Sequence, residues 1–335
     1  MDLATEFDFL LQRYAVQPVL VDVGASGGSP DIWRPIARHS TYIGFDPDLR
    51  EVKRDTVDGY KAGVVINKAI SENPSATSVT FYLTESPYCS STLEPDEEAL
   101  SAYSFWKLFG VRRMVTVPAT TLSRVVLEEG LSSIDWLKID SQGTDLRIYR
   151  SIDDPLRNRI IAVDTEPGLL DAYRDEDLFV DVHRYLKSEG FWLSNLNVMG
   201  AQRISKSAMD ALGVDPAGDP PGLTADQLRI SPGWCEARYI RTTTWLRDTA
   251  AREREYIVSW IFSVLDRQYG HALDVAQTIR EVLPATPLGA RLWEQATQLL
   301  QTHPLSTPNG RGGASSGGLE VSRLRRIVRK ALRLR

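Results

Sequence analysis

The stretch PVLVDVGASGGSP (18–30), with TYIGFDPD (41–48) after it, decides the fold. Residues 19–23 form an apolar run interrupted only by Asp22, which is typical of a parallel strand buried on both faces. A glycine-rich turn follows at 24–28, residues 31–38 have the pattern of a helix, and residues 41–45 have that of a second strand. This segment predicts a βαβ unit whose glycine turn lies at the end of the first strand.

The same alternation of strands and helices continues along the chain. It predicts further strands at 62–66, 134–139 and 160–163, an added edge or hairpin strand at 79–83, weaker strands at 191–195 and 237–241, and helices at 3–14, 49–60, 120–129, 145–151 and 178–189. Residues 84–105 are polar and irregular and are expected to form a loop over the site. Strands that alternate with helices favour a doubly wound, mostly parallel α/β sheet of the Rossmann-like kind.

The domain organisation changes after residue 242. Residues 1–242 are expected to hold the α/β domain, and residues 243–302 a C-terminal helical extension. Residues 303–318 (HPLSTPNGRGGASSGG) have the composition of a flexible linker. Residues 319–335 then form a basic amphipathic tail with seven Lys or Arg and one Glu.

Composition and charge exclude several classes of protein. A net charge of −5 over 335 residues argues against a general nucleic-acid binder. The two cysteines are far apart and form neither a zinc motif nor a disulfide framework. No apolar stretch is long enough to span a membrane, and the N-terminal segment has acids and no apolar core of the signal-peptide kind. We therefore expect a cytoplasmic protein with no fixed metal and an oligomeric state that the sequence does not define.

The tail has apolar residues on one helical face and arginines on the others, a pattern typical of helices that bind anionic membrane surfaces. One hypothesis is that residues 319–335 hold the protein at the inner face of a membrane. The alternatives are a solubilising tail or a helix that docks on a partner protein.

A nucleoside-binding pattern surrounds the first strand. Glycines allow close approach of a ligand to the backbone, and Asp46 ends the second strand, where a carboxylate can accept hydrogen bonds from both ribose hydroxyls. The turn reads G-x-S-G-G and not G-x-G-x-x-G, which disfavours a dinucleotide, because a pyrophosphate requires the full glycine spacing. The alternative is that the glycines only make a tight strand-to-helix turn.

Four segments resemble the FkbM family of methyltransferases in order and spacing. They are VDVGASGG (21–28), IGFDPD (43–48), INKAIS (66–71) and WLKIDSQGTDLRIYRSI (136–152), and the likeness extends over residues 18–195. The resemblance implies a class I methyltransferase fold, S-adenosylmethionine as donor, and O-methylation of a saccharide, a lipid-linked glycan or a natural product. It assigns the donor site to Asp22, Gly24, Ser26, Gly28, Asp46, Asn67 and Ala69.

Two groups of acids follow neighbouring strands, and Asp140 is also a position that the resemblance marks. Asp140 comes directly after the strand 134–139, and Asp164 and Glu166 come after the next one. Ligands of such sheets bind beyond the carboxyl ends of the strands, so Asp140 and then Glu166 are predicted to orient or deprotonate the acceptor hydroxyl. In the alternative, Asp140 caps a turn or a helix and Glu166 is a solvated loop acid. A side hypothesis is that Asp140, Asp164 and Glu166 together hold Mg²⁺.

Two rival functions remain open from the sequence. One is a nicotinamide-dependent oxidoreductase, disfavoured by the glycine spacing. The other is a catalytically silent scaffold in glycan synthesis, disfavoured by the intact Asp22, Gly24 and Asp46.

Overall fold

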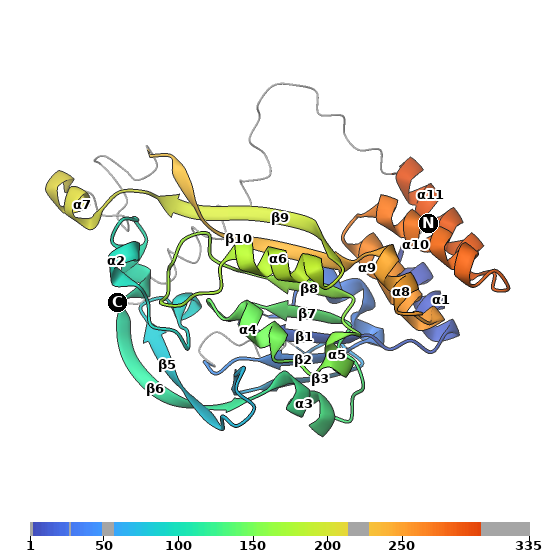
Figure 1. The fold of residues 1–335 in the computed structure, drawn as a ribbon, viewed down its shortest axis with the longest axis horizontal. Coiled ribbons are helices and arrows are strands. Elements are labelled where there is room, and N and C mark those ends of the chain that lie inside the picture. Colours follow the sequence, from blue (N-terminus) through green and yellow to red (C-terminus); the bar gives the residue numbers. More distant parts are fainter. Residues whose placement is uncertain (1–2, 27, 49–56, 214–227, 303–335) are drawn as a thin grey trace.

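The computed structural model describes residues 3–26, 28–48, 57–213 and 228–302. Its centre is a seven-stranded sheet with the order β3-β2-β1-β7-β8-β10-β9 (Figure 1). The strands are β1 (Val19–Val23), β2 (Thr41–Phe45), β3 (Ala62–Ile66), β7 (Trp136–Ile139), β8 (Ala162–Thr165), β9 (Phe191–Gln202) and β10 (Ile230–Arg241). The first five are parallel, and β10 and β9 follow antiparallel. The predicted doubly wound, mostly parallel α/β fold is confirmed.

The apolar run of β1 is explained by burial on both faces. Leu20 belongs to the hydrophobic core on one face of the sheet, whereas Val19, Val21 and Val23 belong to the core on the other face. Because successive side chains of a strand point to opposite faces, a strand covered on both sides has no position for a solvated residue.

One face of the sheet is covered by four helices. They are α3 (Leu122–Glu128), α4 (Asp145–Arg150), α5 (Asp154–Arg157) and α6 (Phe179–Ser188). The helices predicted at 120–129, 145–151 and 178–189 are therefore confirmed within two residues at each end.

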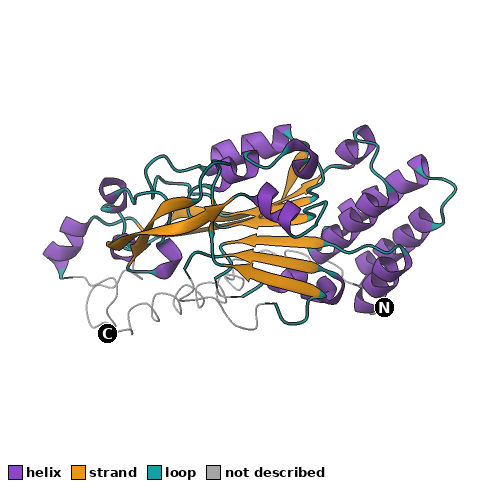
Figure 2. Cartoon of the chain, turned by 90° about the horizontal axis from the view of Figure 1, so that it is seen from below, coloured by secondary structure: helices purple, strands orange, loops and turns teal. Residues whose placement is uncertain are grey.

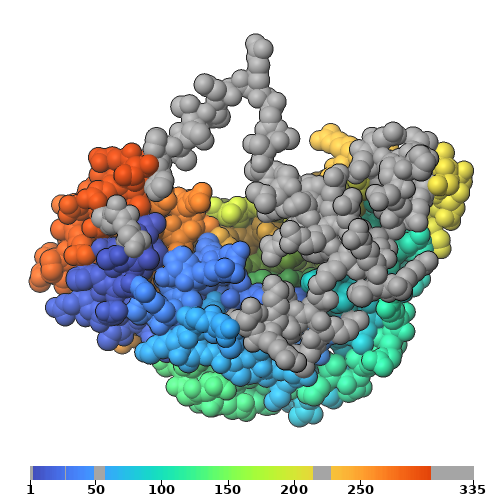
Figure 3. All heavy atoms as spheres, turned by 180° about the vertical axis from the view of Figure 1, so that it is seen from behind, coloured from blue at the N-terminus to red at the C-terminus, as the bar shows by residue number. Residues whose placement is uncertain are grey.

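The opposite face carries both ends of the described chain (Figures 2 and 3). Its elements are α1 (Leu3–Arg13), the 3₁₀-helix η1 (Asp31–His39), α8 (Thr243–Asp248), α9 (Glu253–Leu265), α10 (Tyr269–Val282) and α11 (Leu288–Thr302). Trp136 of β7 contacts Trp33 and Phe262, with ring centroids 6.1 and 4.7 Å away, so η1, the sheet and α9 share one core. The guanidinium of Arg291 on α11 also donates to the Glu6 carboxylate of α1, at 2.7 and 2.8 Å.

A second, three-stranded sheet extends beyond the carboxyl ends of the main strands. It has the order β4-β6-β5, with β4 (Ala69–Ile70), β5 (Ser78–Thr84) and β6 (Val111–Thr120). The short helices near it are η2 (Pro87–Cys89), α2 (Glu97–Leu100), η3 (Trp106–Phe109) and, after β9, α7 (Lys206–Leu212). The strand predicted at 79–83 is confirmed as β5. Its partner β6 was not predicted, because its first four residues are all exposed and the alternation of Val115, Val117 and Ala119 with polar residues is short.

Three local predictions need correction or lie outside the described residues. Residues 31–39 form a 3₁₀-helix and not an α-helix, and Pro35 lies within it, where the proline ring would clash with the carbonyl of residue 31 in an α-helix. The strands predicted at 191–195 and 237–241 are each 12 residues long in the structure. Most of the helix predicted at 49–60 lies outside the described residues, as do the linker 303–318 and the tail 319–335. No helix in the described part of the chain is long and apolar enough to cross a membrane.

The helical extension is anchored to the sheet by a buried ion pair. Arg254 of α9 donates to both oxygens of Asp135, at 2.7 and 2.8 Å, and Asp135 is fully buried. The same carboxylate accepts from the amide of Val19 at 2.8 Å, so it fixes the start of β1 beside β7.

Replacing Arg254 by lysine is expected to lower the free energy of unfolding by about 1–2 kcal/mol, because an ammonium group cannot bind both carboxylate oxygens as the planar guanidinium does. Urea unfolding measures the loss. Arg247→Lys is the matched control: its partner Glu281 is exposed, so the change should stay within about 0.5 kcal/mol. Equal losses in the two variants would contradict a special role for the Asp135 pair.

Candidate functional site

A cavity of about 1500 Å³ lies at the carboxyl ends of the parallel strands. The chain runs from β1 outward to β2 and β3 and then crosses to β7 on the other side, so the strand order reverses between β1 and β7. Open α/β sheets bind ligands at such a reversal, because the loops after the two strands part there. We call the part lined by the ends of β1 and β2 the donor half, and the part lined by the ends of β7, β8 and β10 the acceptor half.

The glycine turn forms the floor of the donor half. Gly24, Ser26 and Gly28 all line the cavity. Gly24 has φ +83°, and a Cβ atom there would lie 2.2 Å from the carbonyl oxygen of Asp140. Its amide donates to the carbonyl of Phe45 at 2.9 Å. The turn is therefore pressed between the ends of β2 and β7, and only glycine fits at position 24.

Asp46 lies at the end of β2 and lines the same half. It is only 7% exposed, and its Oδ1 accepts from the amide of Asp48 at 2.8 Å. Burial raises the pKa of Asp46 to about 7, and the negative charges of Asp48 and Asp140 add to this effect. Its carboxyl group therefore changes charge near neutral pH.

Of two other residues predicted to bind the methyl donor, one lines the cavity and the other does not. Ala69 of β4 lines the cavity. Asn67 is not among the lining residues, and its side-chain amide donates to the backbone carbonyl of Asp46 at 2.9 Å. Asn67 thus stabilises the backbone at the end of β2 from outside the cavity.

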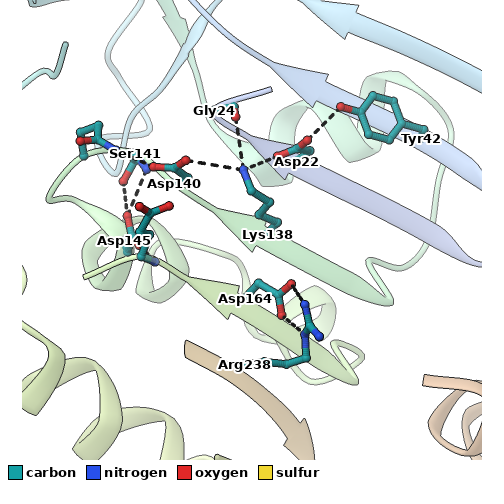
Figure 4. A network of polar contacts seen from close by, with 11 residues as sticks. Asp22, Gly24, Tyr42, Lys138, Asp140, Ser141, Asp145, Asp164 and Arg238 are labelled. Atoms are coloured by element: carbon teal, nitrogen blue, oxygen red, sulfur yellow. Dashed lines mark hydrogen bonds and ion pairs between the residues drawn. The ribbon is translucent and has the colours of Figure 1, made fainter. Parts of the chain in front are cut away.

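Asp22 also lies behind the cavity wall, where it is 1% exposed (Figure 4). Its carboxylate accepts from the hydroxyl of Tyr42 at 3.0 Å and from Nζ of Lys138 at 2.9 Å. Burial raises the pKa of Asp22, and Lys138 opposes that shift. Asp22 is therefore placed to hold Lys138.

Lys138 lines the cavity and was missed by sequence reasoning. Its Nζ lies 3.3 Å from the carbonyl oxygen of Gly24 and 3.8 Å from Oδ2 of Asp140 (Figure 4). Burial opposes its charge, but Asp22 and Asp140 outweigh burial and raise the pKa of the ammonium group. The sequence did contain a sign of this ion pair, because each of two buried strands has a single charged residue and the two charges are opposite. Asp22 and Lys138 are register partners in β1 and β7.

Asp140 enters the acceptor half directly after β7. Its Oδ1 accepts from Nε2 of Gln142 at 2.6 Å, and Oε1 of Gln142 accepts from the hydroxyl of Tyr173 at 3.0 Å. Gln142 has φ +58°, a conformation that favours glycine and brings its side chain back towards Asp140. Gln142 and Tyr173, neither of which was predicted, therefore hold the Asp140 carboxylate.

Glu166 also lines the acceptor half and is held through its backbone. Asp145, which is almost fully buried, accepts from the amide of Glu166 at 2.8 Å and from the hydroxyl of Ser141 at 2.6 Å. Burial raises the pKa of Asp145 to about 6. Burial and then the negative charges of Asp140 and Glu236 raise the pKa of Glu166 well above its ordinary value, and the positive charge of Lys138 opposes that shift.

Asp164 does not join these acids as a metal ligand. Arg238 of β10 donates to both of its oxygens, at 2.7 and 2.9 Å (Figure 4). The described residues contain no group of three His, Cys, Asp or Glu side chains that could hold a metal ion. The Mg²⁺ hypothesis for Asp140, Asp164 and Glu166 is therefore contradicted, since Arg238 occupies the oxygens that it requires.

Comparison with known protein families gives one result. A model of the methyltransferase FkbM domain matches residues 22–193. The match begins at Asp22 in β1 and ends within β9, so it includes the glycine turn, Asp46, Asp140 and Glu166. Neither the comparison with curated proteins nor that with solved structures yields a significant match.

Proposed function

Because this chain belongs to the FkbM methyltransferase family, we propose that it transfers the methyl group of S-adenosylmethionine to a hydroxyl oxygen of a saccharide, a lipid-linked glycan or a natural product. The observation that carries the proposal is one cavity with a ribose-type carboxylate in one half and a held carboxylate, Asp140, in the other.

The residues of the donor half fit this cofactor. Asp46 offers a nearly buried carboxylate to a pair of ribose hydroxyls, and the turn at Gly24, Ser26 and Gly28 offers backbone groups to the aminocarboxylate end. Ala69 and Ile70 line the same half and offer an apolar surface to the adenine base of the cofactor. When bound, S-adenosylmethionine supplies a methyl group on a positively charged sulfur.

The acceptor half fits the removal of a proton from a hydroxyl group. Asp140 is the candidate base, with Gln142 fixing one carboxylate oxygen and Lys138 lying near the other. Glu166 lines the same half and is placed to form a hydrogen bond with the acceptor. A base held in one orientation by its neighbours contributes through both positioning and proton transfer.

The test is calorimetric titration with S-adenosylhomocysteine, the product form of the donor. Asp46→Ala is expected to weaken binding about 10- to 100-fold, the contribution of hydrogen bonds to a charged acceptor. Asp181→Ala, an exposed acid on α6, is the control and should leave binding unchanged. Absence of binding to the wild-type chain, or equal binding by the Asp46 variant, would contradict the donor assignment.

The pH dependence of the same titration follows from Asp46. Because its raised pKa lies near 7, protonation below that pH removes a charged acceptor, and affinity for S-adenosylhomocysteine should fall by at most about tenfold per pH unit. Above the pKa the affinity should level off. Asp46→Asn should remove most of this dependence, whereas a slope that persists in that variant would assign it to other acids, such as Glu176.

A further inference from the structure

A row of four aromatic side chains forms one wall of the acceptor half. Phe105 contacts Trp234 and Phe109, with ring centroids 6.0 and 5.2 Å away, and Phe109 contacts Tyr173 at 5.6 Å. All four line the cavity. Aromatic faces carry partial negative charge, so a row of them favours apolar C–H groups and cations over anions.

Carboxylates supply the polar part of this half. Glu166 and Glu176 line it together with Asp140, and Glu236 adds a fourth from β10, two residues from Trp234 on the same face of the strand. Burial raises the pKa of Glu176 to about 7, and the shift in Glu166 arises partly from Asp140 and Glu236. Asp140 and Glu236 therefore oppose the ionisation of Glu166, and a bound cation would relieve that opposition.

The cationic side chains that line this half are already bound to carboxylates. Lys138 is held by Asp22 at 2.9 Å. Arg238 is held by Asp164 and also by Asp266, which directly follows α9; both contacts are 2.7 Å. Neither is placed to neutralise an anionic group of an acceptor without giving up a buried partner, which is strongly unfavourable.

One buried polar atom among them has no partner. Thr165, the last residue of β8, lies between Asp164 and Glu166, lines the cavity and is 4% exposed. Its hydroxyl has no hydrogen-bond partner among the residues that the structure describes. This hydroxyl is therefore available to bind a polar group of a ligand at the end of β8.

We propose that the acceptor is a hydroxylated amine, such as an amino sugar or aminocyclitol, whose protonated amino group binds between the aromatic row and the carboxylates of Glu166 and Glu236. This inference rests on the proposed function and deepens it by naming the charge of the substrate. The amino group donates to the carboxylates and faces the aromatic rings, while the hydroxyl to be methylated reaches Asp140. Phosphorylated acceptors are excluded by the same charges.

The experiment compares three sugars by ligand-observed NMR titration of the full-length protein loaded with S-adenosylhomocysteine. Glucosamine is expected to bind about 10- to 100-fold tighter than N-acetylglucosamine, because acetylation removes the charge that the carboxylates bind. Glucose 6-phosphate should show no binding. Glu236→Gln should weaken the binding of glucosamine about tenfold and leave the binding of N-acetylglucosamine unchanged. Glu128→Gln, at an exposed position of α3, should change the affinity for neither sugar.

Equal or tighter binding of the acetylated or phosphorylated sugar overturns the proposal, and so does absence of binding by all three. Calorimetric titration with S-adenosylhomocysteine alone separates this failure from failure of the proposed function. If the donor product binds but the order of the sugars is reversed, only the charge of the acceptor is wrong. If the donor product does not bind, the donor assignment fails, and the sugar titrations on the unloaded protein still test the acidic, aromatic wall by itself.

Discussion

Replacing Asp140 by asparagine is expected to slow methyl transfer about 10²- to 10⁴-fold, the usual contribution of a positioned general base. The amide has nearly the shape of the carboxyl group but cannot take the proton of the acceptor hydroxyl. Lys138, at 3.8 Å, then lies beside a neutral oxygen. The measurement is release of S-adenosylhomocysteine at saturating acceptor, with any acceptor that the wild-type protein methylates.

The control for Asp140→Asn is the affinity of the variant for S-adenosylhomocysteine, which should stay within a few-fold of wild type. The glycine turn packs mainly against the backbone carbonyl of residue 140, which the substitution leaves in place. Gln142→Ala should reduce the rate less than Asp140→Asn, since Gln142 acts by holding the carboxylate. An Asp140→Asn variant that retains most of the rate of methyl transfer would exclude Asp140 as the base and leave Glu166 as the next candidate.

Replacing Lys138 by methionine is expected to lower the free energy of unfolding by about 3 kcal/mol, at the lower end of the range for breaking a buried ion pair because the Lys138 side chain is 24% exposed. The change leaves the carboxylate of Asp22, 1% exposed, with the hydroxyl of Tyr42 and without a positive partner. Urea unfolding, compared with Lys187→Met at an exposed position of α6, measures the loss.

A double variant distinguishes the lost charge from lost packing. When Asp22→Asn is combined with Lys138→Met, no buried charge remains unpaired, so most of the lost stability should return. If Lys138→Met is no more destabilising than Lys187→Met, the two strands are not coupled through this pair. If the double variant is as unstable as Lys138→Met alone, the loss comes from the packing of the lysine side chain.

Local sequence patterns were sufficient for the elements that follow from burial and backbone geometry. A strand covered on both faces must be apolar throughout, so β1 and β2 are visible as short apolar runs. The turn at Gly24 is visible because the close approach of Asp140 excludes any side chain there. Asp46 and Asp140 follow parallel strands, and the ends of parallel strands share one edge, so both were expected at the cavity.

Features that depend on contacts between distant segments were not visible. The outer halves of β9 and β10 are half-exposed, and they exist as strands because each pairs with the other along almost its whole length. Trp234, Glu236 and Arg238 reach the cavity only through that pairing. Tyr173 reaches Gln142 from a loop 31 residues away, a contact that no spacing in the sequence marks.

The sequence by itself determined the alternation of parallel strands and helices in the main sheet, the glycine turn and the two acids at strand ends, because these depend on periodicity and on which backbone conformations each residue permits. Only the tertiary structure decided which charges meet. It paired Asp22 with Lys138 and Asp164 with Arg238, and it left Asp46, Asp140 and Glu166 to line the cavity. The physical reason is that the energy of a charge depends on its burial and its neighbours, and both are set by strand register and packing across the whole chain.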